Sequence, residues 1–153
     1  MDQQTDPVMA ELGAAIEAHQ QGDNETARAM FAAIWARLGP DGDPLHRCTL
    51  SHFMADAQAD PVEKLRWDER ALAAADSLTD ERAKSYHASL SVRGFYPSLH
   101  LNLAQDHWLL DDLPRARKEL AAARATVHNL ADDEYGKGIR AAIDRMAATL
   151  SED

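Results

Sequence analysis

Histidine–aspartate pairs are the first feature of the sequence that could do chemistry. In three places a histidine stands four residues before an aspartate: His52/Asp56, His107/Asp111 and His128/Asp132. On a helix such residues share a face, and a protonated imidazole gains roughly a few tenths of a kcal/mol from the carboxylate. His52/Asp56 could do more, because Thr49 stands on the same stripe and a carboxylate can orient an imidazole as a general base. Both interpretations of this pair stay open.

Metal and nucleotide motifs are the next candidates. His46, Cys48 and His52 do not have a recognised zinc spacing, and there is no second cysteine to complete a thiolate site. The sequence contains no HExxH, GxSxG, P-loop or GxGxxG motif, and no strand precedes the glycines of YGKGIR at 135–140. We therefore expect no catalytic residues, no metal site and no cofactor, and a protein that is not an enzyme.

The stretch FYPSLHLNLAQDHW at 95–108 holds two histidines, His100 and His107, seven residues apart. On one helical stripe they could hold a metal, or they could fill a core. The stretch also contains a Trp, a Tyr and an Asn. The helices around it decide between the two interpretations.

Charge and composition narrow the classes of function. The chain has 153 residues, of which 45% are hydrophobic, and 26 Asp and Glu stand against 16 Lys and Arg. A formal charge of −10 repels phosphate backbones, so we expect no nucleic-acid partner. The basic run Arg115, Arg117, Lys118 is typical of the solvated face of a helix. Self-association as a homodimer stays open.

Targeting and membrane segments are not expected. The start MDQQTDPVMAELG lacks the basic and apolar regions of a signal peptide, and Cys48 is the single cysteine, so no internal disulfide can form. No apolar run approaches the roughly 18 residues that a membrane-spanning helix needs. We expect a cytoplasmic protein with no membrane partner.

The fold class predicted from the sequence is all-α. Val and Ile are few, Ala is abundant, and Gly and Pro stand almost entirely at junctions. Apolar residues recur with helical spacing in eight segments. These are about 7–21, 24–38, 44–58, 61–78, 80–92, 97–110, 113–129 and 132–150. Short loops predict that consecutive helices are antiparallel neighbours.

Two helix pairs have matching patterns. LGAAIEAHQQGDNETARAMFAAIW at 12–35 and LNLAQDHWLLDDLPRARKELAAAR at 101–124 both read as helix, short break, helix. The second helices carry a small, a large and a small or apolar residue at the same spacing. These are Ala27, Phe31 and Ile34 in the first and Ala116, Leu120 and Ala123 in the second. The first helices match at Ala15 and Ala104, and the turn residue Gly22 is replaced by Asp111.

This pattern resembles the tetratricopeptide repeat, a helix–turn–helix of about 34 residues. The resemblance implies one domain, 1–153, built as a right-handed stack of antiparallel helix pairs. The pairs would be 8–38, 44–78 and 97–129, with an inserted helix at 79–96 and a capping helix at 132–150. The middle pair is degenerate, because Lys64 or Leu65 stands where Ala is expected.

The resemblance also implies a function and a site. In this family the stripe with His100 and His107 faces the second helix of the pair, so both imidazoles are expected to fill the core. The other face of the helix points into a concave groove. Here that face carries Ser98, Leu101, Asn102, Gln105 and Trp108. Trp provides contact area and the amides can bond a peptide backbone. We therefore expect an interaction module, or scaffold, whose partner is a protein or peptide.

The chemistry of the guest follows from what the groove lacks. The best-known groove of the family clamps a peptide carboxylate with Lys, Arg and Asn, and here Asn102 alone matches. The first-repeat positions Leu12, Gly13 and Ile16 carry no charge. An apolar helix or loop is therefore the expected guest.

A rival interpretation is an enclosed pocket. His52, Asp56, His87, Arg93 and Tyr96 could meet beneath the inserted helix and hold a small ligand or metal, or do catalysis, or could extend the partner-binding surface. VRGFYP at 92–97 is either a junction pinned by ring packing or a recognition loop. If 79–96 roofs the groove, Trp108 is buried instead of reachable.

Overall fold

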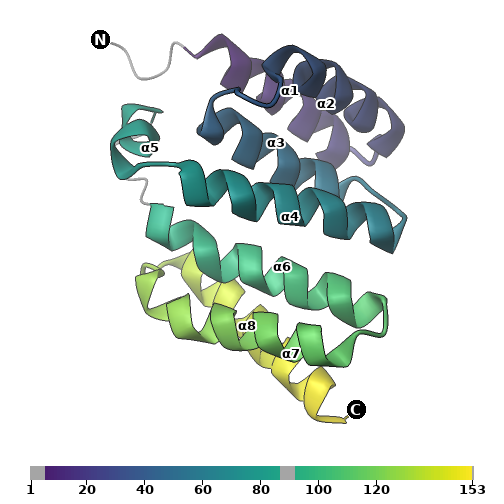
Figure 1. The fold of residues 1–153 in the computed structure, drawn as a ribbon, viewed down its shortest axis with the longest axis vertical. Helices are drawn as coiled ribbons and strands as arrows, with labels where there is room; N and C mark the ends of the chain where they lie inside the picture. Colours follow the sequence, from purple (N-terminus) through teal and green to yellow (C-terminus); the bar gives the residue numbers. More distant parts are fainter. Residues whose placement is uncertain (1–5, 87–91, 153) are drawn as a thin grey trace. The chain divides into compact units, whose positions relative to one another are not determined.

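The computed structural model describes residues 6–86 and 92–152, which fold into two compact units, Met1–Leu90 and Ser91–Asp153 (Figure 1). We call them unit 1 and unit 2 and describe each by itself. Throughout the described residues the regular structure is helical, without a strand, which confirms the all-α prediction. Within the same residues no helix is both long and apolar enough to cross a membrane.

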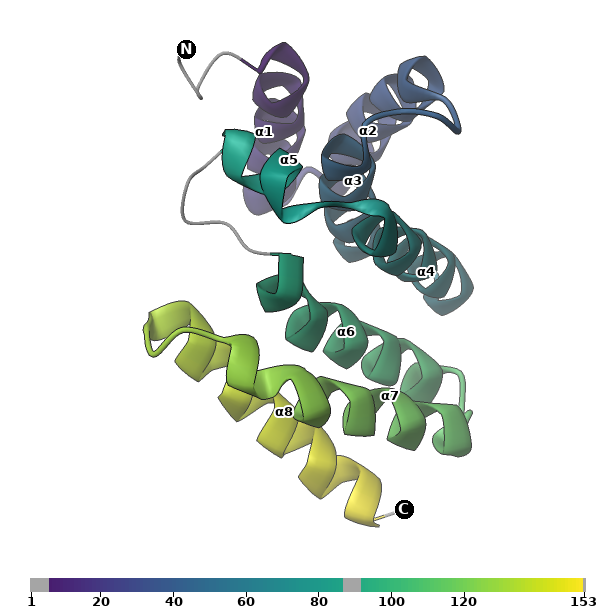
Figure 2. The same cartoon turned by 60° about the vertical axis from the view of Figure 1, so that its left-hand side comes forward.

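The described residues of unit 1, 6–86, form five helices. They are α1 (Pro7–Gln20), α2 (Asn24–Leu38), α3 (Pro44–Asp56), α4 (Pro61–Ser77) and α5 (Asp80–Tyr86). The first four agree with the predicted ranges to within two residues. Of the expected helix 80–92, α5 covers Asp80–Tyr86, residues 87–91 lie outside the described part of the chain, and Val92 belongs to a 3-10 segment. α1 lies beside α2, and α3 beside α4, as Figure 2 shows.

Over its described range, 92–152, unit 2 has three α-helices and two short 3-10 segments. They are η1 (Val92–Phe95), α6 (Tyr96–Leu109), α7 (Leu113–Thr126), η2 (Val127–Asn129) and α8 (Glu134–Glu152). α6 and α7 form an antiparallel pair, and α8 packs against both (Figure 2). The last turn of the predicted helix 113–129 is the 3-10 segment η2, which begins where α7 ends.

Aspartates at the helix starts explain where several helices begin. Asp23 caps α2 and Asp60 caps α4, where they accept hydrogen bonds from Thr26 N at 3.1 Å and Val62 N at 3.1 Å. The carboxylate oxygen satisfies an amide that has no partner inside the helix. Asp6, Asp43 and Asp112 do the same for α1, α3 and α7.

The two matching helix pairs make the same turn. Gly22 has φ +85°, and Asp111, its predicted counterpart, has φ +60°; among the described residues it is the one non-glycine with positive φ. The following amide then closes the same hydrogen bond, Asp23 N to Ala18 O at 3.0 Å and Asp112 N to His107 O at 2.8 Å. This is the Schellman turn that ends a helix with a left-handed residue.

Substitutions at these two turns should have opposite effects. Gly22→Ala should lower the free energy of unfolding by about 1 kcal/mol, because a Cβ disfavours the left-handed backbone. A Cβ there would meet nothing within 4 Å, so the cost is that of the backbone alone. Asp111→Gly should raise it by up to about 1 kcal/mol, since it removes the same strain. Urea unfolding measures both, and equal signs would contradict the shared turn.

Each unit has its own apolar core. In unit 1 the cluster centres on Leu12, Ala15, Phe31, Leu50 and Trp67. In unit 2 it is made by Leu101 and Ala104 of α6, Ala116, Leu120 and Ala123 of α7, and Ile143, Met146 and Leu150 of α8. The small and large residues of the two matching patterns are therefore all buried.

The sequence of α4 places apolar residues in two stripes at helical spacing, and one of these stripes is buried. Trp67, Ala71, Ala74 and Leu78 are all less than 9% exposed. The other stripe, of Val62, Leu65 and Leu72, is partly open, and Val62 is 42% exposed.

Candidate functional site

The groove between α6 and α8 in unit 2 holds two of the predicted partner-binding residues. It has a volume of about 320 Å³. Its lining residues are Gln105, Trp108 and Leu109 from α6 and Ala142, Arg145, Met146 and Thr149 from α8. Trp108 is 38% exposed and Leu109 49% exposed, so two large apolar side chains stand next to each other at the surface. The Trp108 side chain is therefore partly reachable from solvent.

The packing of α6 against α8 explains the position of this groove. Leu101 and Ala104 of α6 are buried with Ile143 and Met146 of α8 in the unit 2 core. Trp108 is one helical turn beyond Ala104, where the core ends, so its ring lies at the edge of the unit 2 core. Leu101 was expected in the open groove, but it is 3% exposed because α8 covers it.

The chemistry of the groove is that of an adaptable apolar surface with a polar edge. Met146 lines it with a flexible, polarisable side chain. Gln105 is exposed and offers both a donor and an acceptor. Arg145, exposed on α8, is the one charged side chain of the lining.

Ser98 is placed differently from the rest of the predicted set. It is buried, its Oγ donates to Phe95 O at 3.1 Å, and it accepts from Tyr135 Oη at 3.2 Å. Both hydrogen bonds of the Ser98 hydroxyl are therefore made within unit 2, where they link the start of α6 to the start of α8. Asn102 is half-buried.

Arg93 and Tyr96 lie at the junction that leads into α6. Arg93 is exposed on η1, and Tyr96 is half-buried and stacks on His100 with ring centroids 5.9 Å apart. The structure thus has ring packing at this junction, which is one of the two alternatives for VRGFYP.

His100 and His107 face inward, as predicted. His100 Nδ1 lies 2.8 Å from Glu119 Oε2 of α7, and both side chains are less than one-fifth exposed. His107 is 8% exposed. A neighbouring carboxylate therefore satisfies the His100 imidazole, although the sequence pattern did not identify Glu119 as its partner.

His52 and Asp56, the pair singled out for acid–base chemistry, lie on α3 of unit 1. His52 is half-buried and packs edge-on against Phe53 at 4.9 Å between ring centroids, while Asp56 is exposed. Burial lowers the pKa of His52, and the charge of Asp56 opposes this with a smaller effect. The His52 imidazole is therefore held in its neutral form at pH 7.

The residues of the rival pocket are divided between the units. His52 and Asp56 belong to unit 1, Arg93 and Tyr96 to unit 2, and His87 lies outside the described residues. Within 6–86 and 92–152, no group of three or more His, Cys, Asp or Glu could hold a metal ion. Cys48 is buried, which raises the pKa of its thiol to about 12 and makes it a poor nucleophile at neutral pH.

A polar cluster in unit 1 escaped the sequence analysis. His46 Nε2 lies 2.9 Å from Asp6 Oδ2, and Arg82 Nη2 donates to the same oxygen at 3.2 Å. Arg82 Nε also donates to Asp43 Oδ2 at 2.6 Å. Asp6 and Asp43 are the caps of α1 and α3, so one guanidinium fastens α5 to the starts of two helices. No local sequence pattern pairs Asp6 with a residue 76 positions away.

The charge of Asp6 should contribute to stability in a pH-dependent way. Burial raises the pKa of Asp6, but the hydrogen bonds with His46, the Met9 amide and Arg82 outweigh it, so the pKa falls below the ordinary 3.8. A lowered folded pKa stabilises the fold above the unfolded value, and this contribution is lost as pH falls through the folded pKa.

Asp6→Asn tests this contribution, since asparagine still caps α1. The variant should unfold at a lower urea concentration than wild type at pH 7, and the difference should shrink below about pH 4. A difference that stays constant from pH 7 to pH 3 would contradict a role for the charge.

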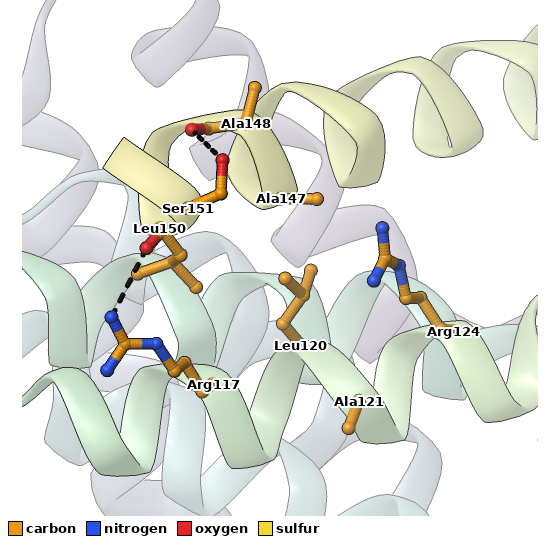
Figure 3. A pocket seen from close by; sticks show the side chains of 8 residues that line it. All are labelled: Arg117, Leu120, Ala121, Arg124, Ala147, Ala148, Leu150 and Ser151. Atoms are coloured by element: carbon orange, nitrogen blue, oxygen red, sulfur yellow. Dashed lines mark hydrogen bonds between the residues drawn. The ribbon is translucent and has the colours of Figure 1, made fainter. Parts of the chain in front are cut away.

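A second groove in unit 2 runs between α7 and α8 (Figure 3). It has a volume of about 680 Å³, and Arg117 and Arg124 stand along it with Leu120 between them. Arg117 Nη2 donates to Leu150 O at 3.2 Å, one of the carbonyls in the last turn of α8. Arg117 is exposed, as expected for the basic run, but this hydrogen bond also gives it a structural role as a cap of α8.

The chain matches no protein-family model, no curated protein and no solved structure, so the site is interpreted from its own geometry.

Proposed function

We propose that this chain is an interaction module that binds a protein or peptide segment in the groove between α6 and α8. The observation that carries the proposal is the exposure of Trp108 and Leu109 at that groove. Leaving large apolar side chains exposed to water costs free energy. Two such side chains exposed beside a groove are typical of binding sites. Trp is also the residue type most enriched among the energetic centres of interfaces.

The architecture we propose with this function is a tetratricopeptide-like right-handed stack. Two observations support it. The pairs α1–α2 and α6–α7 share a left-handed turn residue, Gly22 and Asp111, with the same hydrogen bond after it. Both pairs also bury their matching small and large residues. In such a stack the exposed face of α6 belongs to the concave surface, and α8 caps the last pair.

The groove chemistry indicates what kind of segment would bind. Trp108, Leu109 and Met146 offer an apolar surface, which a Leu, Met or aromatic side chain would fill. Gln105 can bond a peptide backbone, and Arg145 favours a carboxylate at the edge of the segment. We therefore propose a short amphipathic helix or loop with apolar anchors and one acidic residue as the guest.

Selection from a random peptide library tests the proposal without a guessed partner. Enriched peptides should carry apolar anchors, and they should lose affinity for Leu109→Ser. Val62→Ser is the matched control, because Val62 is similarly exposed but lies in unit 1. Failure to enrich any peptide, or equal binding to both variants, would reject this groove as the site.

A further inference from the structure

Two arginines and two tryptophans form a cluster in unit 1 that the peptide groove does not use. Arg47 of α3 lies over the Trp35 ring of α2, with Cζ 4.4 Å from the ring centroid. Arg70 of α4 lies over the Trp67 ring at 4.3 Å and also 5.8 Å from Trp35. The two indoles meet edge-on at 5.1 Å. Both cations are therefore gathered over one aromatic pair.

Among the described residues of unit 1, the charges of Arg47 and Arg70 have no carboxylate as an ion-pair partner. Residues 1–90 contain 16 Asp and Glu but eight Lys and Arg, so acidic groups are in excess. Nevertheless, in the described part of unit 1, neither Arg47 nor Arg70 forms an ion pair with any of them. By contrast, Arg66, one turn before Arg70, pairs with Glu63 at 2.9 Å. Two like charges held over one ring repel each other, and an anion between them would relieve this repulsion.

The same two arginines line a small pocket. It has a volume of about 260 Å³ and lies where the loop between α2 and α3 meets the last turns of α4. The pocket is also lined by Pro40 and Gly42 of the loop and by Ser77 of α4. Arg47 Nη1 donates to Gly39 O at 2.5 Å, which fixes that guanidinium and leaves its other N–H groups for a ligand.

We infer that this pocket binds a phosphate group between Arg47 and Arg70. Planar guanidinium forks match the oxygen atoms of a phosphate, and the tryptophan rings hold both forks in place from behind. The Ser77 hydroxyl lies exposed at the pocket edge, where it donates to Ala73 O at 3.5 Å, so the two guanidinium groups supply the donors of the site. This site lies in unit 1 and uses none of the residues of the peptide groove. The phosphate proposal can therefore be tested independently of the peptide proposal.

Calorimetric titration of the whole chain with inorganic phosphate, at an ionic strength held constant with NaCl, is the test. We expect saturable binding with a dissociation constant of about 1 mM or lower. Arg70→Gln should weaken binding at least about tenfold, since a hydrogen bond to a charged group is lost. Arg70→Lys should weaken it too, because lysine keeps the charge but loses the fork.

Arg66→Gln is the matched control, because it makes the same change of charge on the same helix outside the pocket. It should shift the dissociation constant by less than about twofold. Absence of saturation below about 20 mM phosphate, or equal weakening by Arg66→Gln and Arg70→Gln, would overturn the site. O-phosphoserine distinguishes the source: tighter binding than inorganic phosphate indicates a phosphate ester on a partner, and weaker binding indicates the free anion.

Discussion

Phe31→Ala should lower the free energy of unfolding by about 3–5 kcal/mol. Phe31 is fully buried and is the largest side chain with no exposure in unit 1. It packs among Leu12, Ala15 and Leu50, from two other helices, so its removal would leave a cavity that three helices must share. Urea unfolding followed by circular dichroism measures the loss.

Phe31→Leu is the matched control for this prediction. The corresponding residue of the other matching pair is Leu120, which is also buried. A leucine at 31 keeps most of the volume, so the loss should be below about 1.5 kcal/mol. Equal losses for the two variants, or an unchanged midpoint for Phe31→Ala, would mean that this residue does not hold α1, α2 and α3 together.

Trp108→Ala should reduce the affinity for a peptide selected on this chain by about 2 kcal/mol or more, roughly thirtyfold. The reason is that a bound segment would desolvate the ring, which lines the α6–α8 groove. The effect on folding should be smaller than the roughly 3–5 kcal/mol of a fully buried aromatic, because Trp108 is already 38% exposed. Titration calorimetry and thermal unfolding of the same variant measure the two effects.

Tyr135→Ala controls for the loss of an exposed aromatic ring in unit 2, and its thermal midpoint is measured as well because it also removes the hydrogen bond from Tyr135 Oη to Ser98 Oγ. Tyr135 is 58% exposed and does not line the groove. We expect it to leave the peptide affinity within about twofold of wild type. A Trp108→Ala variant that unfolds readily and shows no separate loss of binding would instead indicate that the ring has a structural role.

Helix positions were predictable from the sequence because their causes are local. The apolar period of 3.6, the aspartate caps and the prolines in the first turns all act within a few residues, and α1 to α4 begin and end where these signals predict. Asp111 was predictable for the same reason, since it takes the place of Gly22 in a matching pattern.

Contacts between distant residues could not be predicted in this way. The bond of Arg82 to Asp6 joins residues at opposite ends of unit 1. Leu101 was assigned to an open surface because the pattern of α6 alone does not reveal that α8 covers it. Likewise Arg47 and Arg70 each look like solvated charges until the indoles of Trp35 and Trp67 are placed beneath them.

Mapping the footprint of a bound peptide by amide chemical-shift changes tests the central claim most directly. Peptide binding at the proposed site should shift Gln105, Trp108 and Leu109 of α6 together with Arg145 and Thr149 of α8, including the Trp108 indole N–H. These changes should saturate at one peptide per chain and vanish in Leu109→Ser. Shifts confined to the α7–α8 groove or to unit 1, with the α6–α8 groove unaffected, would contradict it.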